Sequence, residues 1–131
     1  MRVIFSGSRN WNDPAPVNAA LDAVERRWRL EGGVGPITVV HGAARGLDTL
    51  AGQLAAQRPF MAVESVPANW DAYGKAAGHL RNQEMVDAGA RMAFAFPIGE
   101  SRGTRDFIRR ATAAGVPVFV YSGGYFHRFS E

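Results

Sequence analysis

Short apolar runs alternate with amphipathic segments along the whole chain. The apolar runs carry few polar residues, which is typical of strands that helices cover on both faces. They lie at about residues 2–6, 37–41, 60–66, 91–97 and 116–121. The amphipathic segments repeat apolar side chains at helical spacing. They lie at about residues 14–31, 46–57, 78–88 and 103–114.

This alternation predicts an α/β fold, a Rossmann-like domain of three α/β/α layers with a mainly parallel five-stranded sheet. We expect one domain over residues 1–131, because no repeat or linker interrupts the pattern. Residues from about 122 to 131, SGGYFHRFSE, contain three aromatic residues and no clear element, so we expect an aromatic C-terminal tail. At the first helix, Asp13 is suited to cap the helix and Pro14 to occupy its first position.

The composition limits the class of protein. Hydrophobic residues make up 47% of the chain, which is enough for a packed core. No apolar stretch has membrane-spanning length, and the N-terminal run lacks a small-residue cleavage site. Zero cysteines exclude disulfides and thiolate metal sites, and the three histidines lack metal-ligand spacing. We therefore expect a cytoplasmic protein with no membrane partner, metal or cofactor.

The basic residues are almost all arginine. The formal net charge is +3, and only Lys75 among the 15 basic residues is a lysine. Arginine presents a fixed fork of donors that suits phosphates and carboxylates. The arginines are scattered, however, with no run of five or more. Nucleic acid binding is therefore allowed but not favoured, and an arginine-rich soluble surface is the alternative.

Loops at one edge of the predicted sheet hold most of the candidate chemistry. In an open parallel sheet, ligands bind outside the carboxyl ends of the strands. The four loops that follow strands there are SGSRNWND, HGAARGLD, PANWDAYGKAAGHLRN and PIGESRGTRD, all rich in Gly, Ser, Arg, Asn or Asp. The loops at the opposite edge are plain helix stops. This asymmetry predicts a binding site at the carboxyl edge.

The fourth loop is the strongest candidate for binding an anion. It opens a helix, so free backbone N–H groups and the positive end of the helix dipole point into the crevice. Its glycines allow close backbone approach, and its hydroxyl groups add donors. The alternative is an ordinary helix start with turn glycines. The candidate residues are Pro97, Gly99, Ser101, Gly103 and Thr104.

The second loop repeats this logic around Gly42, Ala43 and Gly46. Asp48 follows in the first helical turn, where it is suited to hold a ribose hydroxyl or a neighbouring arginine, or only to interact with the helix dipole. His41 ends an apolar strand and is better read as a core histidine than as a catalytic one.

The first loop adds Ser6, Gly7 and Ser8 as turn and donor residues, and Arg9 as a phosphate partner. Trp11 either stacks on a base or packs the first helix against the sheet, and we favour packing. The third loop is long enough to close over a ligand. Its candidate ligand-binding residues are Asn69, Trp70, Tyr73 and Lys75.

Arg81 and Asn82 lie in the opening turns of the next helix. An arginine is poorly placed there, because the helix dipole favours anions at that end. A bound anion would relieve this conflict. The alternative is a surface arginine paired with Asp71 or Glu84.

Taken together and in this order, the motifs SGSRNWND, HGAARGLDTLA, PANWDAYGKAAGHLRNQEM and AFPIGESRGTRD resemble the SLOG superfamily of Rossmann-like domains. The sequence is most similar to its small stand-alone YspA/YpsA-related branch. The superfamily also includes the Lonely Guy phosphoribohydrolases and the DprA/Smf DNA-processing proteins. The resemblance implies a nucleotide or nucleotide-derived ligand. It also implies a homodimer or higher homo-oligomer.

In Lonely Guy enzymes an Arg-Lys-x-x-Met helix and a Pro-Gly-Gly-x-Gly-Thr-x-x-Glu loop hold a nucleoside monophosphate. RNQEM matches the first motif at Arg81, with Asn82 at the lysine position, and PIGESRGTRDF resembles the second. The catalytic glutamate position carries Phe107, and Asp106 precedes it, turned about 100° around the helix. If the chain is an enzyme, we expect Arg81 and Asp106 to be catalytic, with Glu64 as a weaker alternative carboxylate.

Three functions remain open. We favour a domain that binds or senses a nucleotide or nucleotide-derived ligand. A phosphoribohydrolase-like N-glycosidase is the first alternative. DprA-like binding of single-stranded DNA is the second, and it would use the scattered arginines with the aromatic tail. These arginines include Arg26, Arg27, Arg29, Arg109 and Arg110.

Overall fold

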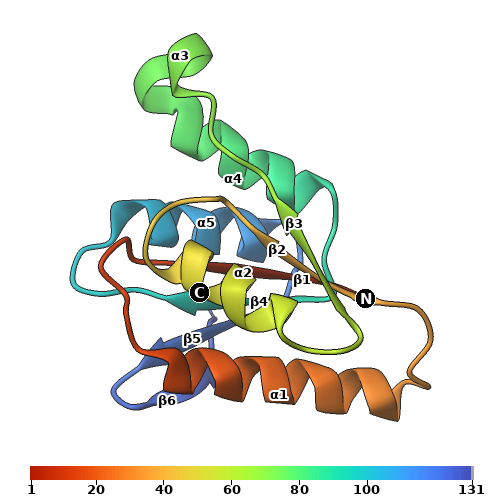
Figure 1. Ribbon diagram of the computed structural model, residues 1–131. Coiled ribbons are helices and arrows are strands. Elements are labelled where there is room, and N and C mark those ends of the chain that lie inside the picture. The colour runs from red at the N-terminus through yellow and green to blue at the C-terminus, as the bar shows by residue number, and fades with distance from the viewer. Residues whose placement is uncertain (131) are drawn as a thin grey trace.

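The computed structural model describes residues 1–130 as an α/β fold with helices on both faces of one sheet (Figure 1). The described residues form a six-stranded sheet. Its strands are β1 (Arg2–Gly7), β2 (Ile37–His41), β3 (Met61–Ser65), β4 (Met92–Phe96), β5 (Val118–Ser122) and β6 (Tyr125–Arg128). The helices are α1 (Pro14–Leu30), α2 (Leu47–Ala56), α3 (Trp70–Tyr73), the 3-10 turn η1 (Gly74–Ala76), α4 (Ala77–Asp87) and α5 (Arg102–Ala113).

The strand order creates a crevice at the carboxyl edge of the sheet. The order is β3-β2-β1-β4-β5-β6, and the first five strands in sequence run parallel. The chain moves outward in one direction from β1 to β3 and then crosses back to β4. The carboxyl ends of β1 and β4 therefore flank a topological switch point, where ligands of such sheets bind.

Two hydrophobic clusters hold the helices to the sheet. On one face, α1 and α2 pack through residues such as Leu21, Trp28 and Leu47 against β1, β2 and β4. On the other face, α4 and α5 pack through Met85, Phe107 and their neighbours. Figure 1 shows α1 on one side of the sheet and α4 and α5 on the other, with α3 lying farthest from it. No helix among residues 1–130 combines the length and the apolar character needed to cross a membrane.

The predicted five-stranded sheet is wrong by one strand, because part of the expected tail forms β6. Gly123 and Gly124 have φ of +66° and +91°, and this pair makes a tight hairpin after β5. β6 pairs antiparallel with β5 and places the Phe126 ring 5.6 Å from Phe96 and 5.0 Å from Tyr121, measured between ring centres. Partial burial of this ring against the core explains why the segment folds back. Residue 131 lies outside the described residues.

Candidate functional site

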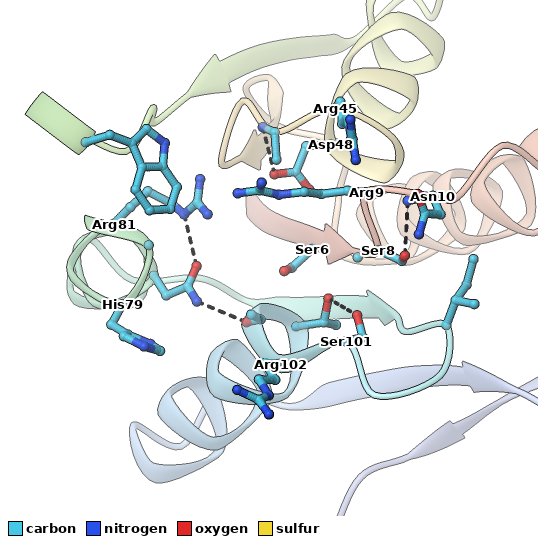
Figure 2. A pocket seen from close by; sticks show the side chains of 18 of the residues that line it. Ser6, Ser8, Arg9, Asn10, Arg45, Asp48, His79, Arg81, Ser101 and Arg102 are labelled. Carbon is cyan, nitrogen blue, oxygen red and sulfur yellow. Dashed lines mark hydrogen bonds between the residues drawn. The ribbon is translucent and has the colours of Figure 1, made fainter. Parts of the chain in front are cut away.

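A cavity of about 480 Å³ lies at the switch point, with walls from the four loops that follow β1, β2, β3 and β4 (Figure 2). Most of the residues expected to bind a ligand line it: Ser6, Gly7, Ser8, Arg9, Asp48, Trp70, Lys75, Arg81, Asn82, Ser101, Gly103 and Thr104. It is also lined by residues that the sequence interpretation missed: Asn10, Ala44, Arg45, Gly78, His79, Ile98 and Arg102. Other expected residues lie outside it: Gly42, Ala43, Gly46, Asn69, Tyr73, Pro97, Gly99 and Asp106.

The start of α5 forms one wall and is open to the cavity. Among the described residues, no side chain caps the backbone N–H groups of this helix, and its first turn contains no acidic residue. Ser101 adopts φ +43°, and its hydroxyl donates to Thr104 Oγ1 at 2.9 Å instead of capping the helix. The free amides and the helix dipole therefore favour an anion at this wall.

Positive side chains surround the rest of the cavity. Arg9, Arg45 and Lys75 have no carboxylate within ion-pair distance in the described part of the chain. The Arg9 guanidinium lies 5.7 Å from the centre of the Trp70 ring, a cation–π contact that joins the first loop to α3. These positive charges lie in a cavity that has one carboxylate in its lining, so the local field favours an anionic ligand.

Arg81 is held against the second loop. Its guanidinium donates to the Gly42 carbonyl, and its Nε donates to Asn82 Oδ1 at 3.0 Å. A Cβ atom at position 42 would overlap the guanidinium, so Gly42 leaves the space that Arg81 occupies. Burial lowers the pKa of Arg81, while the nearby Asp48 carboxylate acts in the opposite direction. Neither Asp71 nor Glu84 is the partner of this arginine.

Asp48 is the carboxylate that lines the cavity, and it is almost fully buried. Its Oδ2 accepts hydrogen bonds from the backbone N–H groups of Gly42, at 3.1 Å, and Ala44, at 3.3 Å. Its Oδ1 is buried and has no hydrogen-bond partner among the described residues. Burial raises the pKa of Asp48 to about 6, although the backbone hydrogen bonds and the charge of Arg81 lower it in part. Asp48 thus organises the second loop at a cost in stability.

Gly46 explains how the first two loops fit together. Its φ of +77° suits glycine, and a Cβ atom there would overlap the Arg9 carbonyl. The Leu47 N–H also donates to the Ser8 carbonyl at 3.1 Å. This glycine therefore allows the two loops to pack backbone against backbone while remaining outside the cavity.

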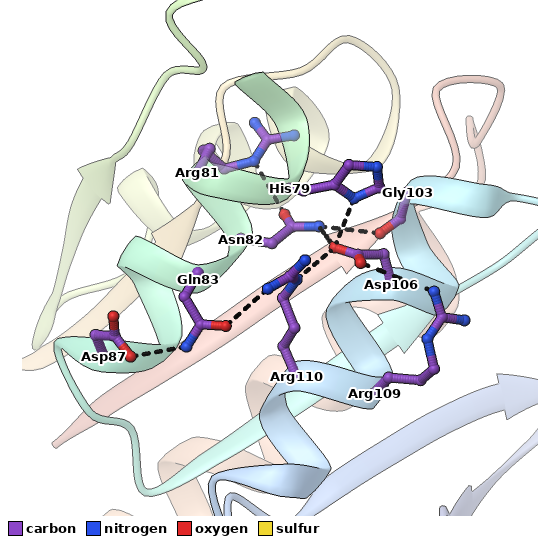
Figure 3. A network of polar contacts seen from close by, with 9 residues as sticks. All are labelled: His79, Arg81, Asn82, Gln83, Asp87, Gly103, Asp106, Arg109 and Arg110. Atoms are coloured by element: carbon purple, nitrogen blue, oxygen red, sulfur yellow. Dashed lines mark hydrogen bonds and ion pairs between the residues drawn. The ribbon is translucent and has the colours of Figure 1, made fainter. Parts of the chain in front are cut away.

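Asp106 lies behind the cavity wall, between α4 and α5 (Figure 3). Its Oδ2 accepts from Asn82 Nδ2 at 3.0 Å and Arg110 Nε at 2.9 Å, and it lies 3.1 Å from His79 Nδ1. Asn82 Nδ2 also donates to the Gly103 carbonyl at 3.1 Å. Burial acts to raise the pKa of this carboxyl, but its hydrogen bonds and the Arg110 charge outweigh burial and hold the pKa below its usual value.

Comparison with known proteins supports the family resemblance of the four sequence motifs. A family model described as "YspA, cpYpsA-related SLOG family" matches residues 1–73, more than half of the chain. A curated relative, "Gene 61 protein" of Mycobacterium phage D29, is 45% identical over 124 residues, covering 92% of this chain and 95% of the relative. The chain belongs to the YspA, cpYpsA-related SLOG family. Its Rossmann-like fold is that expected of a SLOG protein.

The side chains of three residues of this SLOG chain, Phe107, Glu64 and Asn69, have structural roles outside the cavity. Phe107, at the Lonely Guy glutamate position, is fully buried in the core, so its side chain does not face the cavity. Glu64 lies outside the cavity and pairs with Arg2 at 2.8 Å. Asn69 caps the short helix α3 by accepting from the Ala72 N–H at 3.1 Å.

Trp11 in the first loop and His41 at the end of β2 both have structural roles in this SLOG chain. The Trp11 ring lies 5.3 Å from Phe96 and 5.8 Å from Tyr121, measured between ring centres, as expected for a residue that packs α1 against the sheet. His41 is buried, and its Nδ1 accepts from the Ala43 N–H at 2.9 Å. Burial, and then the charge of Arg81, lower the pKa of His41.

Proposed function

We propose that this SLOG chain binds a nucleotide or nucleotide-derived ligand in the cavity, with a phosphate group at the start of α5. The observation that carries the proposal is the open start of α5, whose amides face a cavity lined by Arg9, Arg45 and Lys75, which have no carboxylate partner among the described residues. A phosphate would accept from these amides and from the Ser101 and Thr104 hydroxyls. Arg9, Arg45 and Lys75 would balance its charge.

The nucleoside part of the ligand would extend toward α3 and α4. Trp70 is half exposed and its ring is suited to stack on a base, in exchange for the Arg9 guanidinium that now lies over it. A cavity of about 480 Å³ is within the usual range for small-molecule sites. Both parts of the ligand would thus contact loops that meet at the switch point.

DNA binding has less support. Arg27 and Arg29 lie on α1 and pair with Glu31 and Glu25, whereas Arg110 lies on α5 across the sheet and is bound to Asp106. These arginines therefore form no continuous basic track, and Phe126 of the expected aromatic tail is packed in β6.

Thermal shift and calorimetric titration test the proposal with the four common ribonucleoside 5′-monophosphates and the matching nucleosides. A ligand selective for the native state raises Tm. We expect at least one monophosphate to raise Tm and its nucleoside to bind at least tenfold more weakly, because it lacks the phosphate. Equal affinity of the pair, or no binding by any compound, would contradict the proposal.

A matched pair of variants locates the site. Arg45→Glu reverses an exposed charge in the cavity, and we expect it to lower nucleotide affinity at least tenfold. Arg26→Glu makes the same change on the exposed face of α1, outside the cavity, and is expected to leave affinity unchanged. Equal losses in both variants would indicate a nonspecific charge effect.

A further inference from the structure

Three buried hydroxyl side chains, Ser6, Ser8 and Thr104, line the cavity. Ser6 lies near the carboxyl end of β1 and Ser8 directly after it, whereas Thr104 lies in the first turn of α5. In the view of Figure 2, Ser6 lies between Arg9 of the first loop and Ser101 at the start of α5. The hydroxyl groups therefore extend from the proposed phosphate position at α5 to the first loop.

The serine hydroxyls of the first loop can still donate a hydrogen bond. Ser8 Oγ accepts from the Asn10 N–H at 3.1 Å, which leaves its own proton for a ligand. Ser6 is only 9% exposed, and its hydroxyl has no hydrogen-bond partner in the described part of the chain. A buried polar group without a partner costs free energy. A ligand that accepts hydrogen bonds at this point of the cavity would remove that cost.

The positive charge of the cavity exceeds what one phosphate group can balance. Arg9, Arg45 and Lys75 line the cavity and have no carboxylate partner among residues 1–130. A phosphate monoester carries about −1.5 to −2 charge at pH 7, so it matches at most two of these cations. Arg9 and Arg45 also come from the loops after β1 and β2, and not from α5. The charge therefore favours a second anionic group away from the start of α5.

We propose that the ligand is a nucleoside 5′-diphosphate whose second phosphate binds the Ser6 and Ser8 hydroxyls between Arg9 and Arg45. This inference rests on the proposed function, which places the first phosphate at the start of α5. The second phosphate would accept hydrogen bonds from the two serines. The two arginines would balance its charge.

The wall made by α3, η1 and α4 is less suited to the second phosphate. Its buried polar side chain, Asn82, already donates through Nδ2 to the Gly103 carbonyl and to Asp106, and its Oδ1 accepts from Arg81 Nε. The half-exposed Trp70 ring on this wall is suited to a base. The two phosphates would thus run from α5 toward the first loop, while the base extends toward α3.

Calorimetric titration in buffer without divalent cations compares three forms of each nucleoside: the 5′-monophosphate, the 5′-diphosphate and the 3′,5′-bisphosphate. For the nucleoside that binds most tightly, we expect the diphosphate to bind at least tenfold more tightly than the monophosphate. The bisphosphate carries the same number of phosphate groups, but its second one is attached to the other side of the ribose. It should gain less than threefold over the monophosphate.

A matched pair of variants locates the second phosphate. Ser6→Ala removes the unpartnered hydroxyl and keeps a small side chain in β1. We expect it to lower the preference for diphosphate over monophosphate at least threefold and to leave monophosphate affinity within twofold. Ser65→Ala makes the same change at the exposed end of β3, outside the cavity, and should keep the full preference. Thermal unfolding of both variants checks that they fold.

The other outcomes separate this inference from the proposed function. A monophosphate that binds as tightly as its diphosphate would overturn the second phosphate site and leave the binding proposal standing. Binding by none of the compounds would overturn both. An equal gain from the bisphosphate would show that charge alone raises affinity, and a folded Ser6→Ala with the full diphosphate preference would overturn the assignment of Ser6.

Discussion

The start of α1 and the start of α5, which forms one wall of the cavity, differ in whether a side chain accepts from their backbone N–H groups. At α1, Asp13 Oδ1 accepts from the Ala15 N–H at 3.1 Å, and Pro14 and Pro16 have no N–H to satisfy. At α5, no described side chain caps the helix. The α1 start is thus satisfied within the chain, whereas the α5 start is open to a ligand.

The acidic residues of the two regions show the same contrast. Asp13 is exposed and stabilises α1 by capping it. Asp48 is buried at the cavity, where burial raises its pKa to about 6. Asp48 is therefore placed at a cost in stability, as is common where a site serves a ligand instead of the fold. Substitutions at each region can test this difference.

The largest expected effect concerns Asp48→Asn and the dependence of stability on pH. The pKa of Asp48 is about 6 in the folded chain and 3.8 as its ordinary value. Between these values the unfolded chain loses this proton first, so the free energy of unfolding falls as pH rises, by about 3 kcal/mol in all. The asparagine side chain keeps an oxygen for the loop amides and has no such loss, because it does not titrate. Urea unfolding from pH 3.5 to 7 measures the effect.

Other carboxylates titrate in the same range, so the informative quantity is the difference between the two proteins. We expect Asp48→Asn to gain stability relative to the unmodified chain as pH rises from about 4 to about 6, and the gain to level off above it. Parallel stability curves would show that burial of this carboxylate costs nothing.

The second largest effect is expected for Gly103→Glu, which should raise the free energy of unfolding and lower nucleotide affinity. Gly103 is exposed in the first turn of α5, and a Cβ atom there meets nothing within 4 Å. Replacing a helical glycine and adding a negative charge at a helix start should stabilise the unliganded chain by about 1 kcal/mol. The same charge lies at the proposed anion site, so nucleotide affinity should fall at least tenfold, or about 1.4 kcal/mol.

Gly103→Gln is the matched control, because it has the same shape without the charge. It should share part of the gain in stability and lose less affinity than Gly103→Glu. Urea unfolding and calorimetric titration measure the two quantities. A fall in the stability of Gly103→Glu would mean that the α5 start is already satisfied, and the contrast with α1 would fail.

The parts of the fold and site that follow from local pattern were predictable. Strand and helix alternate with the expected periods, and loops rich in Gly, Ser, Arg, Asn or Asp follow the first four strands, so the carboxyl edge could be identified without tertiary information. Asp13 and Pro14 likewise predicted the start of α1 correctly. These features depend on residues close together in sequence, where propensity and capping act directly.

The missed features depend on contacts between distant residues. The Gly-Gly turn was a local signal for the β5–β6 hairpin, but the hairpin is fixed by Phe126 packing on β4 and β5. The approach of His79 to Asp106 requires the packing of α4 on α5. Gly42 and Gly46 lie outside the cavity because each makes room for a residue of another segment, Arg81 and Arg9. None of these pairings has a period or spacing in the sequence.

The smallest expected effect is at Asp13→Ala, and it tests whether the two regions are independent. Removing the cap should lower the free energy of unfolding by about 1 kcal/mol, because the Ala15 N–H loses its acceptor. Asp13→Asn keeps an acceptor and should lose much less. Nucleotide affinity should stay within twofold in both variants, because Asp13 does not line the cavity. Calorimetric titration of Asp13→Ala could instead show nucleotide affinity falling together with the free energy of unfolding. The start of α1 would then support the cavity through the first loop, and the capped start of α1 and the uncapped start of α5 would not be independent.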